Sequence, residues 1–223
     1  MRTVIGEILP LAVVVTISPI NIVAAILLLM GERPVVRASC YLAGFVTGVA
    51  VVLGALTAIA GATDLSADPQ RARGASGFLL ALGVVLVVVA VRKFRLRPGP
   101  GETAPPPRWM DGITAVGPSR SLVVGLTVGA VNPKNIAVGL ASAVAIATSG
   151  LTVGPSVGVI AVYTVFASLG VATPIAAMLI LGDRADGVLR SWQTWLDRNN
   201  AAMMAVLYLV FGVLLVGKGI GGI

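Results

Sequence analysis

The sequence contains no histidine and only one cysteine, Cys40, among its 223 residues. A single cysteine cannot form an internal disulfide, and without histidine the usual zinc, haem and thiol-relay chemistries lack their ligands. The apolar part of the chain also lacks a pair of carboxylates that could exchange protons during catalysis. We therefore predict no metal site, no cofactor and no catalytic residue, and we do not expect an enzyme.

Charged residues are scarce as well, at 11% of the chain, whereas hydrophobic residues make up 57%. Because soluble domains carry about 25% charged residues, this composition predicts a protein surrounded by the lipid bilayer, with no nucleic-acid partner. Six apolar segments are long enough to cross a bilayer, which requires about 20 helical residues. We therefore predict an all-α integral membrane protein with six transmembrane helices. Their approximate bounds are Ile8–Met30, Ala38–Gly61, Gly74–Val91, Ser121–Thr148, Pro155–Leu181 and Ala201–Gly217.

Lysine and arginine are distributed unevenly among the connections between these segments. The first, third and fifth connections hold most of the 16 basic residues, whereas the other connections and the two chain ends hold only Arg2, Arg71, Arg73 and Lys218. Basic loops stay in the cytoplasm, so we predict a multi-pass plasma-membrane protein with both termini extracytoplasmic. The basic residues of the odd connections are Arg33, Arg37, Arg92, Lys93, Arg95, Arg97, Arg108, Arg120, Arg184, Arg190 and Arg198.

The central connection divides the chain into two halves of three segments each. We predict a first three-helix repeat at residues 1–94, a Pro-rich cytoplasmic linker at 95–119 and a second three-helix repeat at 120–223. The motif Ser-Pro-Ile-Asn at Ser18–Asn21 returns in the second half as Asn-Pro-Lys-Asn at Asn132–Asn135. Because each half holds an odd number of segments, the two halves form inverted repeats like those of secondary transporters. The alternative is that segments rich in Ala, Val and Gly simply look alike.

Both motifs lie near the middle of a long apolar segment, where proline interrupts a helix. Ser and Asn are favoured helix N-caps, and Pro is favoured at the first helical position. Each motif is therefore predicted to break the first or the fourth transmembrane helix and to start a new helix near the bilayer centre, with a positive dipole end that attracts anions. The candidate substrate-binding residues are Ser18, Pro19, Asn21, Asn132, Pro133, Lys134 and Asn135.

Lys134 is the only charged residue deep inside a predicted span. A central lysine costs at least about 2.5 kcal/mol on membrane insertion, and no acidic residue lies at a comparable depth to neutralise it. Its partner is then a ligand anion or a set of carbonyl oxygens, unless the lysine itself loses its proton. We favour an anion held by Lys134 between two helix starts that face each other.

Two further patterns concern packing. Hydrophobic residues and two tryptophans recur at helical spacing over residues 186–198, which predicts a short helix in the cytoplasmic interface or, alternatively, an extension of the sixth span. Three Gly-x-x-x-Gly pairs allow close helix approach, and we expect them to pack helices within one bundle rather than to form a dimer interface. These pairs are Gly44 and Gly48, Gly125 and Gly129, and Gly154 and Gly158.

The two proline motifs resemble those of the LysE/RhtB superfamily of exporters, and the stretches Ser18–Pro34 and Tyr41–Gly48 are similar to its GAP-like branch. Members of that branch are associated with delivery of glycolipids and sulfolipids to the cell surface. Amino-acid exporters of the superfamily carry Pro-Gly-Pro in the first span, where this chain has Ser-Pro-Ile-Asn, which argues against amino-acid export. The resemblance implies a transport role, without a substrate identity, for Pro19, Asn21, Asn132, Pro133, Lys134 and Asn135.

The sequence therefore predicts a membrane transporter or exporter that moves, or helps to translocate, an amphipathic anionic lipid or glycolipid across the plasma membrane. The alternative is a small-solute exporter of the LysE type, for amino acids or ions. A large lateral opening between spans would favour the first function, and a closed polar cavity would favour the second. Expected partners are the bilayer and an anionic lipid, glycolipid or small anionic solute, with a homodimer or a larger export machinery left open. A membrane enzyme would require an inward polar cluster from the central connection.

Overall fold

The computed structural model describes residues 1–62, 69–95, 112–113 and 116–221, and the regular elements in these ranges are helices. Four of them, or six when each bent pair of shorter helices is one span, are long and apolar enough to cross a membrane. The chain is therefore a multi-pass helical membrane protein. The elements are α1 (Arg2–Thr16), α2 (Pro19–Leu29), α3 (Pro34–Ala62), α4 (Pro69–Arg95), α5 (Pro118–Val131), α6 (Pro133–Ala147), α7 (Val153–Leu181), the short 3-10 helix η3 (Gly182–Arg184) and α8 (Ala185–Gly221).

The two helix breaks lie where the proline motifs predict them. α1 and α2 are separated at residues 17–18 and meet at an angle of 52°, and α5 and α6 are separated at Asn132 and meet at 56°. Pro19 and Pro133 each occupy the first position of the new helix, where the missing N–H costs nothing. The prediction of broken first and fourth helices is confirmed.

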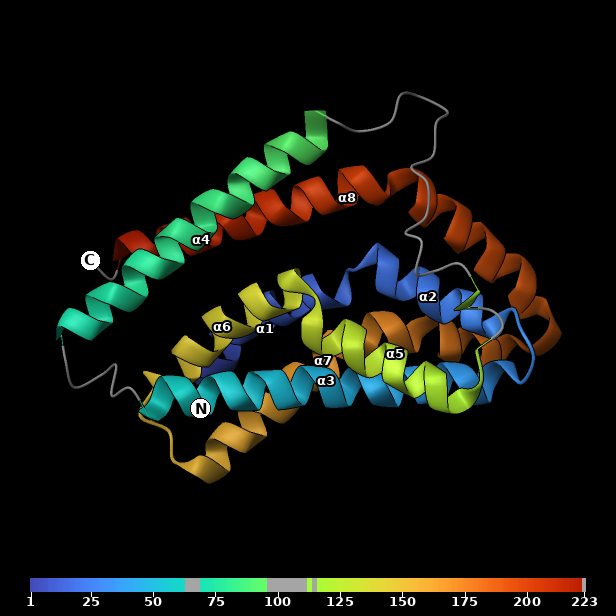
Figure 1. Ribbon diagram of the computed structural model, residues 1–223, viewed down its shortest axis with the longest axis horizontal. Coiled ribbons are helices and arrows are strands. Elements are labelled where there is room, and N and C mark those ends of the chain that lie inside the picture. Colours follow the sequence, from blue (N-terminus) through green and yellow to red (C-terminus); the bar gives the residue numbers. More distant parts are fainter. Residues whose placement is uncertain (63–68, 96–111, 114–115, 222–223) are drawn as a thin grey trace.

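The helix ends are sorted to two sides of the bundle (Figure 1). Both chain termini lie at one side, together with the end of α3, the start of α4 and the connection between α6 and α7. The opposite side holds the α2–α3 connection, the start of α5 and η3, and α4 runs from the first side toward the upper middle of the view. This alternation is the one expected when each bent pair and each long helix crosses the membrane once.

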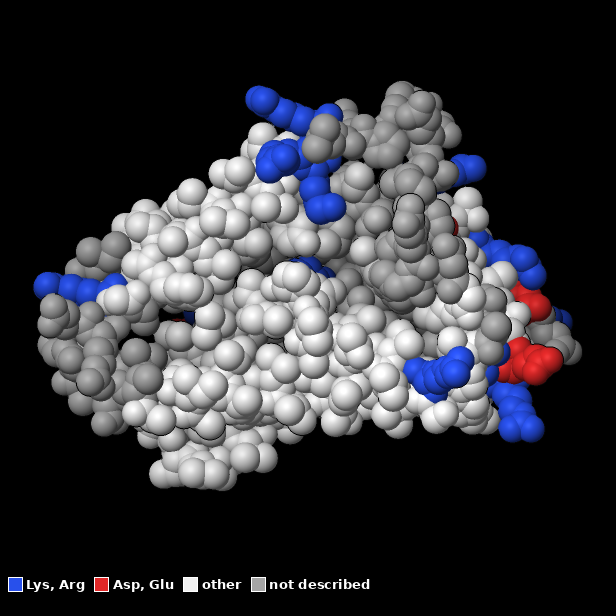
Figure 2. Space-filling model, viewed as in Figure 1, with Lys and Arg blue, Asp and Glu red and all other residues white. Residues whose placement is uncertain are grey.

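Charged side chains avoid most of the surface that faces the viewer in Figure 2. Lys and Arg lie mainly at its upper, right and left margins, Asp and Glu lie at the right end, and most of the area between is uncharged. A surface of this kind suits contact with lipid tails, because a charged side chain at the bilayer centre is costly.

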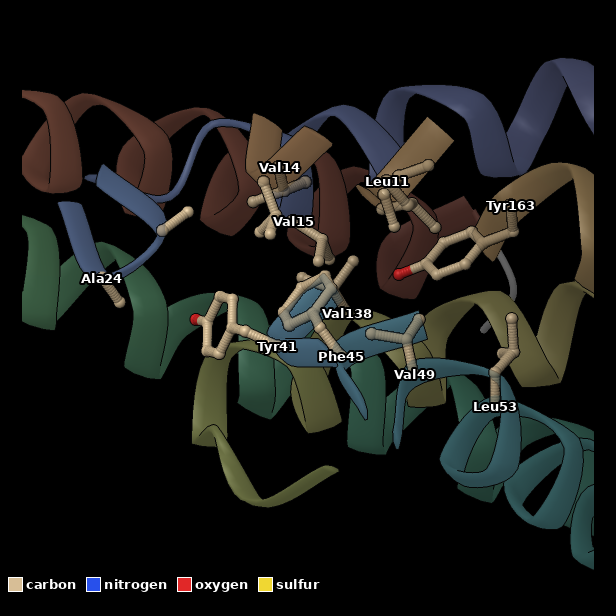
Figure 3. Packing of buried hydrophobic residues seen from close by; sticks show 14 of the residues in the cluster. Leu11, Val14, Val15, Ala24, Tyr41, Phe45, Val49, Leu53, Val138 and Tyr163 are labelled. Atoms are coloured by element: carbon tan, nitrogen blue, oxygen red, sulfur yellow. The ribbon is translucent and has the colours of Figure 1, made fainter. Parts of the chain in front are cut away.

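The buried core lies where α1, α3, α6 and α7 meet (Figure 3). Val14 and Val15 of α1 face Phe45 of α3, and Val138 of α6 and Tyr163 of α7 close the cluster. None of these five side chains is more than 2% exposed. Because lipid tails are as apolar as this core, close packing rather than removal from water holds it together. The core therefore fixes the end of α1 against the start of α6.

The backbones of α3 and α5 pack in direct contact. A Cβ atom at Gly44 would overlap the carbonyl oxygen of Leu122, and a Cβ atom at Gly125 would overlap that of Tyr41. Gly48 and Gly129, one turn further along each helix, face the partner helix in the same way. Both predicted glycine pairs therefore pack helices within the bundle.

The third predicted glycine pair does not serve this purpose. Gly154 has open space where its Cβ would lie, and Gly158 faces only the end of the Met1 side chain. Instead, α4 and α8 approach closely at Gly83, Gly212 and Gly219, which sequence spacing did not single out. A glycine spacing shows where close approach is permitted, and the partner helix decides whether it occurs.

We expect Gly125→Ala to lower the stability of the protein in detergent by about 1–3 kcal/mol, because the added methyl group must push α5 away from the α3 backbone. Thermal unfolding followed by circular dichroism measures the change. Gly54→Ala in α3 is the matched control, since nothing lies within 4 Å of its Cβ position. Equal melting temperatures for the two variants would contradict the proposed backbone contact.

α8 is one continuous helix from Ala185 to Gly221. Residues 186–198 therefore do not form a separate interfacial helix, and the alternative interpretation, an extension of the sixth span, is correct. Figure 1 shows that α8 curves, so that its first part lies beside α2 and α7 and the remainder runs beside α4. The tryptophan-bearing part is thereby placed against the first bent pair.

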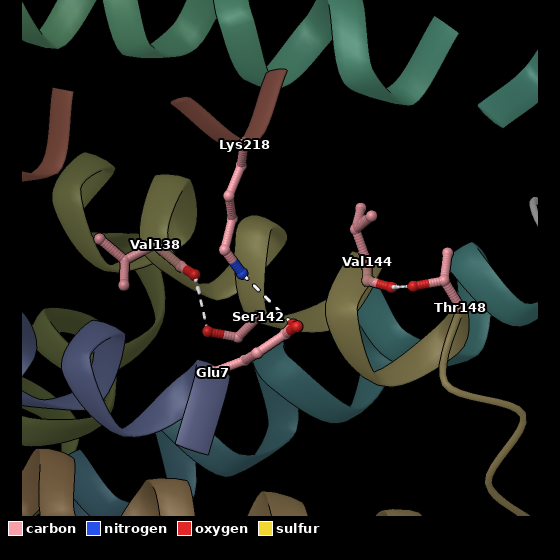
Figure 4. A network of polar contacts seen from close by, with 6 residues as sticks. All are labelled: Glu7, Val138, Ser142, Val144, Thr148 and Lys218. Carbon is pink, nitrogen blue, oxygen red and sulfur yellow. Dashed lines mark hydrogen bonds and ion pairs between the residues drawn. The ribbon is translucent and has the colours of Figure 1, made fainter. Parts of the chain in front are cut away.

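An ion pair connects α1 and α8 near the two ends of the chain (Figure 4). Lys218 Nζ lies 3.4 Å from Glu7 Oε2, and Ser142 of α6 lies close by. The side chains of Lys218 and Glu7 are 36% and 50% exposed, and a pair with this exposure contributes at most about 1 kcal/mol. The pair therefore contributes little to the stability of the fold.

The predicted linker at 95–119 lies largely outside the described residues. Near its end, the carbonyl oxygen of Ile113 accepts a hydrogen bond of 3.0 Å from the Arg37 guanidinium. Arg37 also donates to the carbonyl of Glu32 at 2.8 Å and is only 4% exposed. Arg37 therefore attaches the segment before α5 to the α2–α3 connection, in addition to contributing to the charge that predicts orientation.

Candidate functional site

The first break leaves two carbonyl groups at the end of α1 without their helical donors. Ser18 N–H, which would serve the Val14 carbonyl, bonds to the Thr16 carbonyl at 3.0 Å instead. Pro19 has no N–H to offer the Val15 carbonyl. Ser18 is the N-cap of α2, but its side chain makes no capping hydrogen bond, contrary to the prediction. Two carbonyl oxygens at the negative end of α1 are thus available to a cation.

The second break is capped as predicted. Asn132 Oδ1 accepts a hydrogen bond of 3.0 Å from the Lys134 N–H, and the Asn132 carbonyl accepts from Ile136 N–H at 3.0 Å. The Asn135 side chain reaches back across the break, and its Nδ2 lies 3.3 Å and 3.4 Å from the carbonyl oxygens of Val128 and Gly129. Asn132 and Asn135 together define the bend between α5 and α6.

Lys134 joins the two breaks. Its Nζ donates a hydrogen bond of 2.8 Å to the Val14 carbonyl oxygen, one of the two groups freed at the end of α1. Lys134 is 4% exposed. Of the partners considered for this lysine, carbonyl oxygens are the ones present in this conformation, and they offset part of the cost of burying its charge.

The way in which the breaks meet differs from the prediction in one respect. We expected the two helix starts to face each other, but Lys134 at the start of α6 contacts Val14 near the end of α1. The junction therefore combines a positive helix end, an ammonium group and a negative helix end. An anion that binds here would share the ammonium with the Val14 carbonyl or displace it.

Several polar groups close to the breaks are buried without a partner among the described residues. Asn21, in the first turn of α2, is 1% exposed, and neither its Oδ1 nor its Nδ2 makes a hydrogen bond. Asn135 Oδ1 and the hydroxyl of Tyr41 are also unpartnered. A buried amide or hydroxyl without a hydrogen bond costs about 1–3 kcal/mol, so these groups reduce the stability of this conformation.

The space at the junction is small. A cavity of about 10 Å³ is lined by Val15, Asn135 and Tyr163, among others. Such a volume holds about one water molecule. This conformation is therefore closed around the candidate binding residues, and a substrate could enter only after the helices move apart.

Sequence reasoning found the polar residues of this site but missed two of its components. The Val14 carbonyl is a backbone group, and the motif predicts free carbonyls without saying which one a side chain will reach. Tyr41 lies in the second predicted span, and only its rarity as a polar side chain in an apolar segment signals it. Both are brought to the breaks by packing between the halves.

The fold and this junction define a class: multi-pass helical membrane proteins with two broken helices joined at a buried lysine. The family model for Sap, the sulfolipid-1-addressing protein, matches residues 8–221, and the chain belongs to this family. No curated protein and no solved structure matches the chain. The family description agrees with the sulfolipid-addressing part of the predicted resemblance.

Proposed function

We propose that the protein exports an amphipathic anion, a lipid or glycolipid with a sulfate, phosphate or carboxylate head group, across the plasma membrane. The head group binds at the junction of the two helix breaks. The observation that carries this proposal is the buried Lys134 ammonium between the end of α1 and the start of α6. The family's description, sulfolipid addressing, supports an anionic lipid as the substrate.

The chemistry of the junction suits an anionic head group. The Lys134 ammonium has three N–H donors and uses one on the Val14 carbonyl. The unpartnered Nδ2 of Asn21 is a further donor, and the N–H groups at the start of α6 point in the direction that favours an anion. Head-group binding would satisfy these donors and release the Val14 carbonyl.

Transport requires that the closed junction open to each side of the membrane in turn. The inverted-repeat hypothesis, with a LysE/RhtB-type architecture, provides a route, because two similar halves can exchange conformations. Two contacts support it. α3 of the first half packs against α5 of the second, and α7 of the second half packs against α1 of the first.

A small-solute exporter of the LysE type is the second candidate, and the small size of the junction cavity favours it. Reconstituted vesicles separate the two candidates. Lipid export predicts protein-dependent translocation of fluorescent phosphatidylglycerol, measured by dithionite quenching, and no efflux of lysine or arginine. Efflux of the amino acids without lipid translocation would reverse this conclusion.

The proposed orientation places the central connection in the cytoplasm and both termini outside. On a Cys40→Ser background, we expect Pro100→Cys to react with a membrane-impermeant maleimide only after the cells are opened. Thr152→Cys, an exposed residue in the connection between α6 and α7, should react in intact cells. The opposite pattern would invert the topology and with it the direction of export.

A further inference from the structure

A second, larger cavity lies away from the junction, between α2, α7 and the first part of α8. Its volume is about 530 Å³, within the range of about 300–1,000 Å³ that is typical of ligand pockets. The lining is mainly apolar, and two of the lining residues are exposed tryptophans. Its side chains are Ile22 from α2, Thr173 from α7, and Ser191, Trp192, Trp195 and Leu196 from α8.

We propose that this cavity holds an acyl chain of an anionic lipid whose head group then binds at the junction. This inference rests on the proposed function and deepens it, because it assigns the acyl chain of the substrate to a separate binding site. It also distinguishes the two candidate functions, since a small hydrophilic solute would not bind favourably in an apolar cavity of this size.

The cavity adjoins the first helix break. Gly170 of α7 is part of its lining, and a Cβ atom on Gly170 would overlap the carbonyl oxygen of Thr16 at the end of α1. On the other side, Ile22 lies in the first turn of α2, next to Asn21. A molecule in the cavity therefore contacts the residue that follows Asn21, whose buried amide makes no hydrogen bond with a described residue.

The composition of the walls favours a lipid over a protein partner. Trp192 and Trp195, at 36% and 56% exposed, are the residue type favoured where lipid chains meet head groups. Arg198 lies seven residues after Ser191, so it continues the same helix face, and it is exposed. Its positive charge on the same helix face as Ser191 is complementary to an anionic head group.

Photolabelling of the full-length protein in vesicles tests the proposal. The vesicles contain phosphatidylethanolamine and phosphatidylcholine at 3:1, and the probe is a trace of phosphatidylglycerol with a diazirine near the end of one acyl chain. We expect mass spectrometry to find labels concentrated on Ile22, Thr173 and the peptide with Trp192 and Trp195. Excess unlabelled phosphatidylglycerol should remove them, whereas excess phosphatidylcholine should not.

Cavity-filling variants make the test specific. Ser191→Phe and Thr173→Phe, each at an exposed position, should lower labelling of the cavity at least fivefold. Thr194→Phe is the matched control, because Thr194 is an exposed residue of the same helix that does not line the cavity. Arg198→Gln should weaken the preference for phosphatidylglycerol over phosphatidylcholine.

The outcomes separate this inference from the proposed function. Labelling that is equal in Ser191→Phe, Thr173→Phe and Thr194→Phe, or equally competed by both lipids, would overturn the cavity proposal even if translocation still depends on Lys134. If Lys134→Met translocates lipid normally and its cavity is still labelled, the head-group site would be overturned but the cavity proposal would be supported. Specific labelling in Lys134→Met together with lost translocation supports both.

Discussion

Lys134→Met is expected to reduce lipid translocation to near background while the protein still folds. Methionine keeps much of the length of the side chain but removes the ammonium that binds the head group. Stability should change little, because two effects offset each other. A hydrogen bond from a charged group to the Val14 carbonyl is lost, at about 1.5–3 kcal/mol, and the cost of a central membrane charge, at least about 2.5 kcal/mol, is removed.

Reconstituted lipid translocation and thermal unfolding of the same preparation check this expectation. Lys218→Met is the matched control, since Lys218 is a partly exposed lysine outside the junction and its loss should leave translocation intact. Lys134→Arg should retain partial activity, because it keeps the charge but replaces a compact ammonium with a wide planar group. Normal translocation by Lys134→Met would show that Lys134 is not the anion site, and failure to fold would make it a structural cap for α1.

The positions of the breaks could be predicted from sequence because they depend on local chemistry. Pro19 and Pro133 have no N–H and follow the N-cap residues Ser18 and Asn132, a combination that favours a new helix start. Proline alone does not decide it, since Pro10 and Pro174 lie inside α1 and α7. Asn132 caps the following helix through atoms only two residues apart in the chain. The helices could likewise be predicted from the long apolar segments. In lipid, a single segment can satisfy its backbone hydrogen bonds only as a helix.

What the sequence could not predict depends on packing between distant segments. The hydrogen bond from Lys134 to Val14 spans 120 positions, and no local rule relates the two residues. Glycine spacing predicted close packing for the segments that form α3 and α5, without saying that they contact each other, and it did not predict the close approach of α4 and α8. The pattern permits close approach but does not specify the partner helix. The acyl-chain cavity is formed by three helices, and it depends on the curvature of α8 that brings Trp192 and Trp195 against α2 and α7.

The two asparagines of the motifs have different surroundings, although the motifs align. Asn135 uses its Nδ2 to satisfy carbonyl oxygens at the end of α5, and only its Oδ1 is unpartnered. Asn21 makes no side-chain hydrogen bond with any described residue. The first asparagine therefore reduces the stability of this closed conformation, whereas the second also contributes to it. Natural proteins retain such a cost chiefly where function requires the group.

Asn21→Leu is accordingly expected to raise stability and to abolish transport. Leucine has nearly the same shape as asparagine, so the core is preserved, and about 1–3 kcal/mol of unsatisfied amide burial is removed. For a protein of this size, that corresponds to a rise of a few degrees in the melting temperature. Lipid translocation should fall strongly, because the junction loses a donor and the closed conformation becomes more favourable.

Asn135→Leu is the matched comparison for Asn21→Leu. It should also reduce translocation, but it should lower the melting temperature, because the carbonyls of Val128 and Gly129 lose the Nδ2 that they accept from. Opposite signs of the stability change with a shared loss of transport would identify Asn21 as a group kept for the substrate. A lower melting temperature for Asn21→Leu would instead show that its amide is hydrogen-bonded in the folded protein, and undiminished translocation would exclude it from the head-group site.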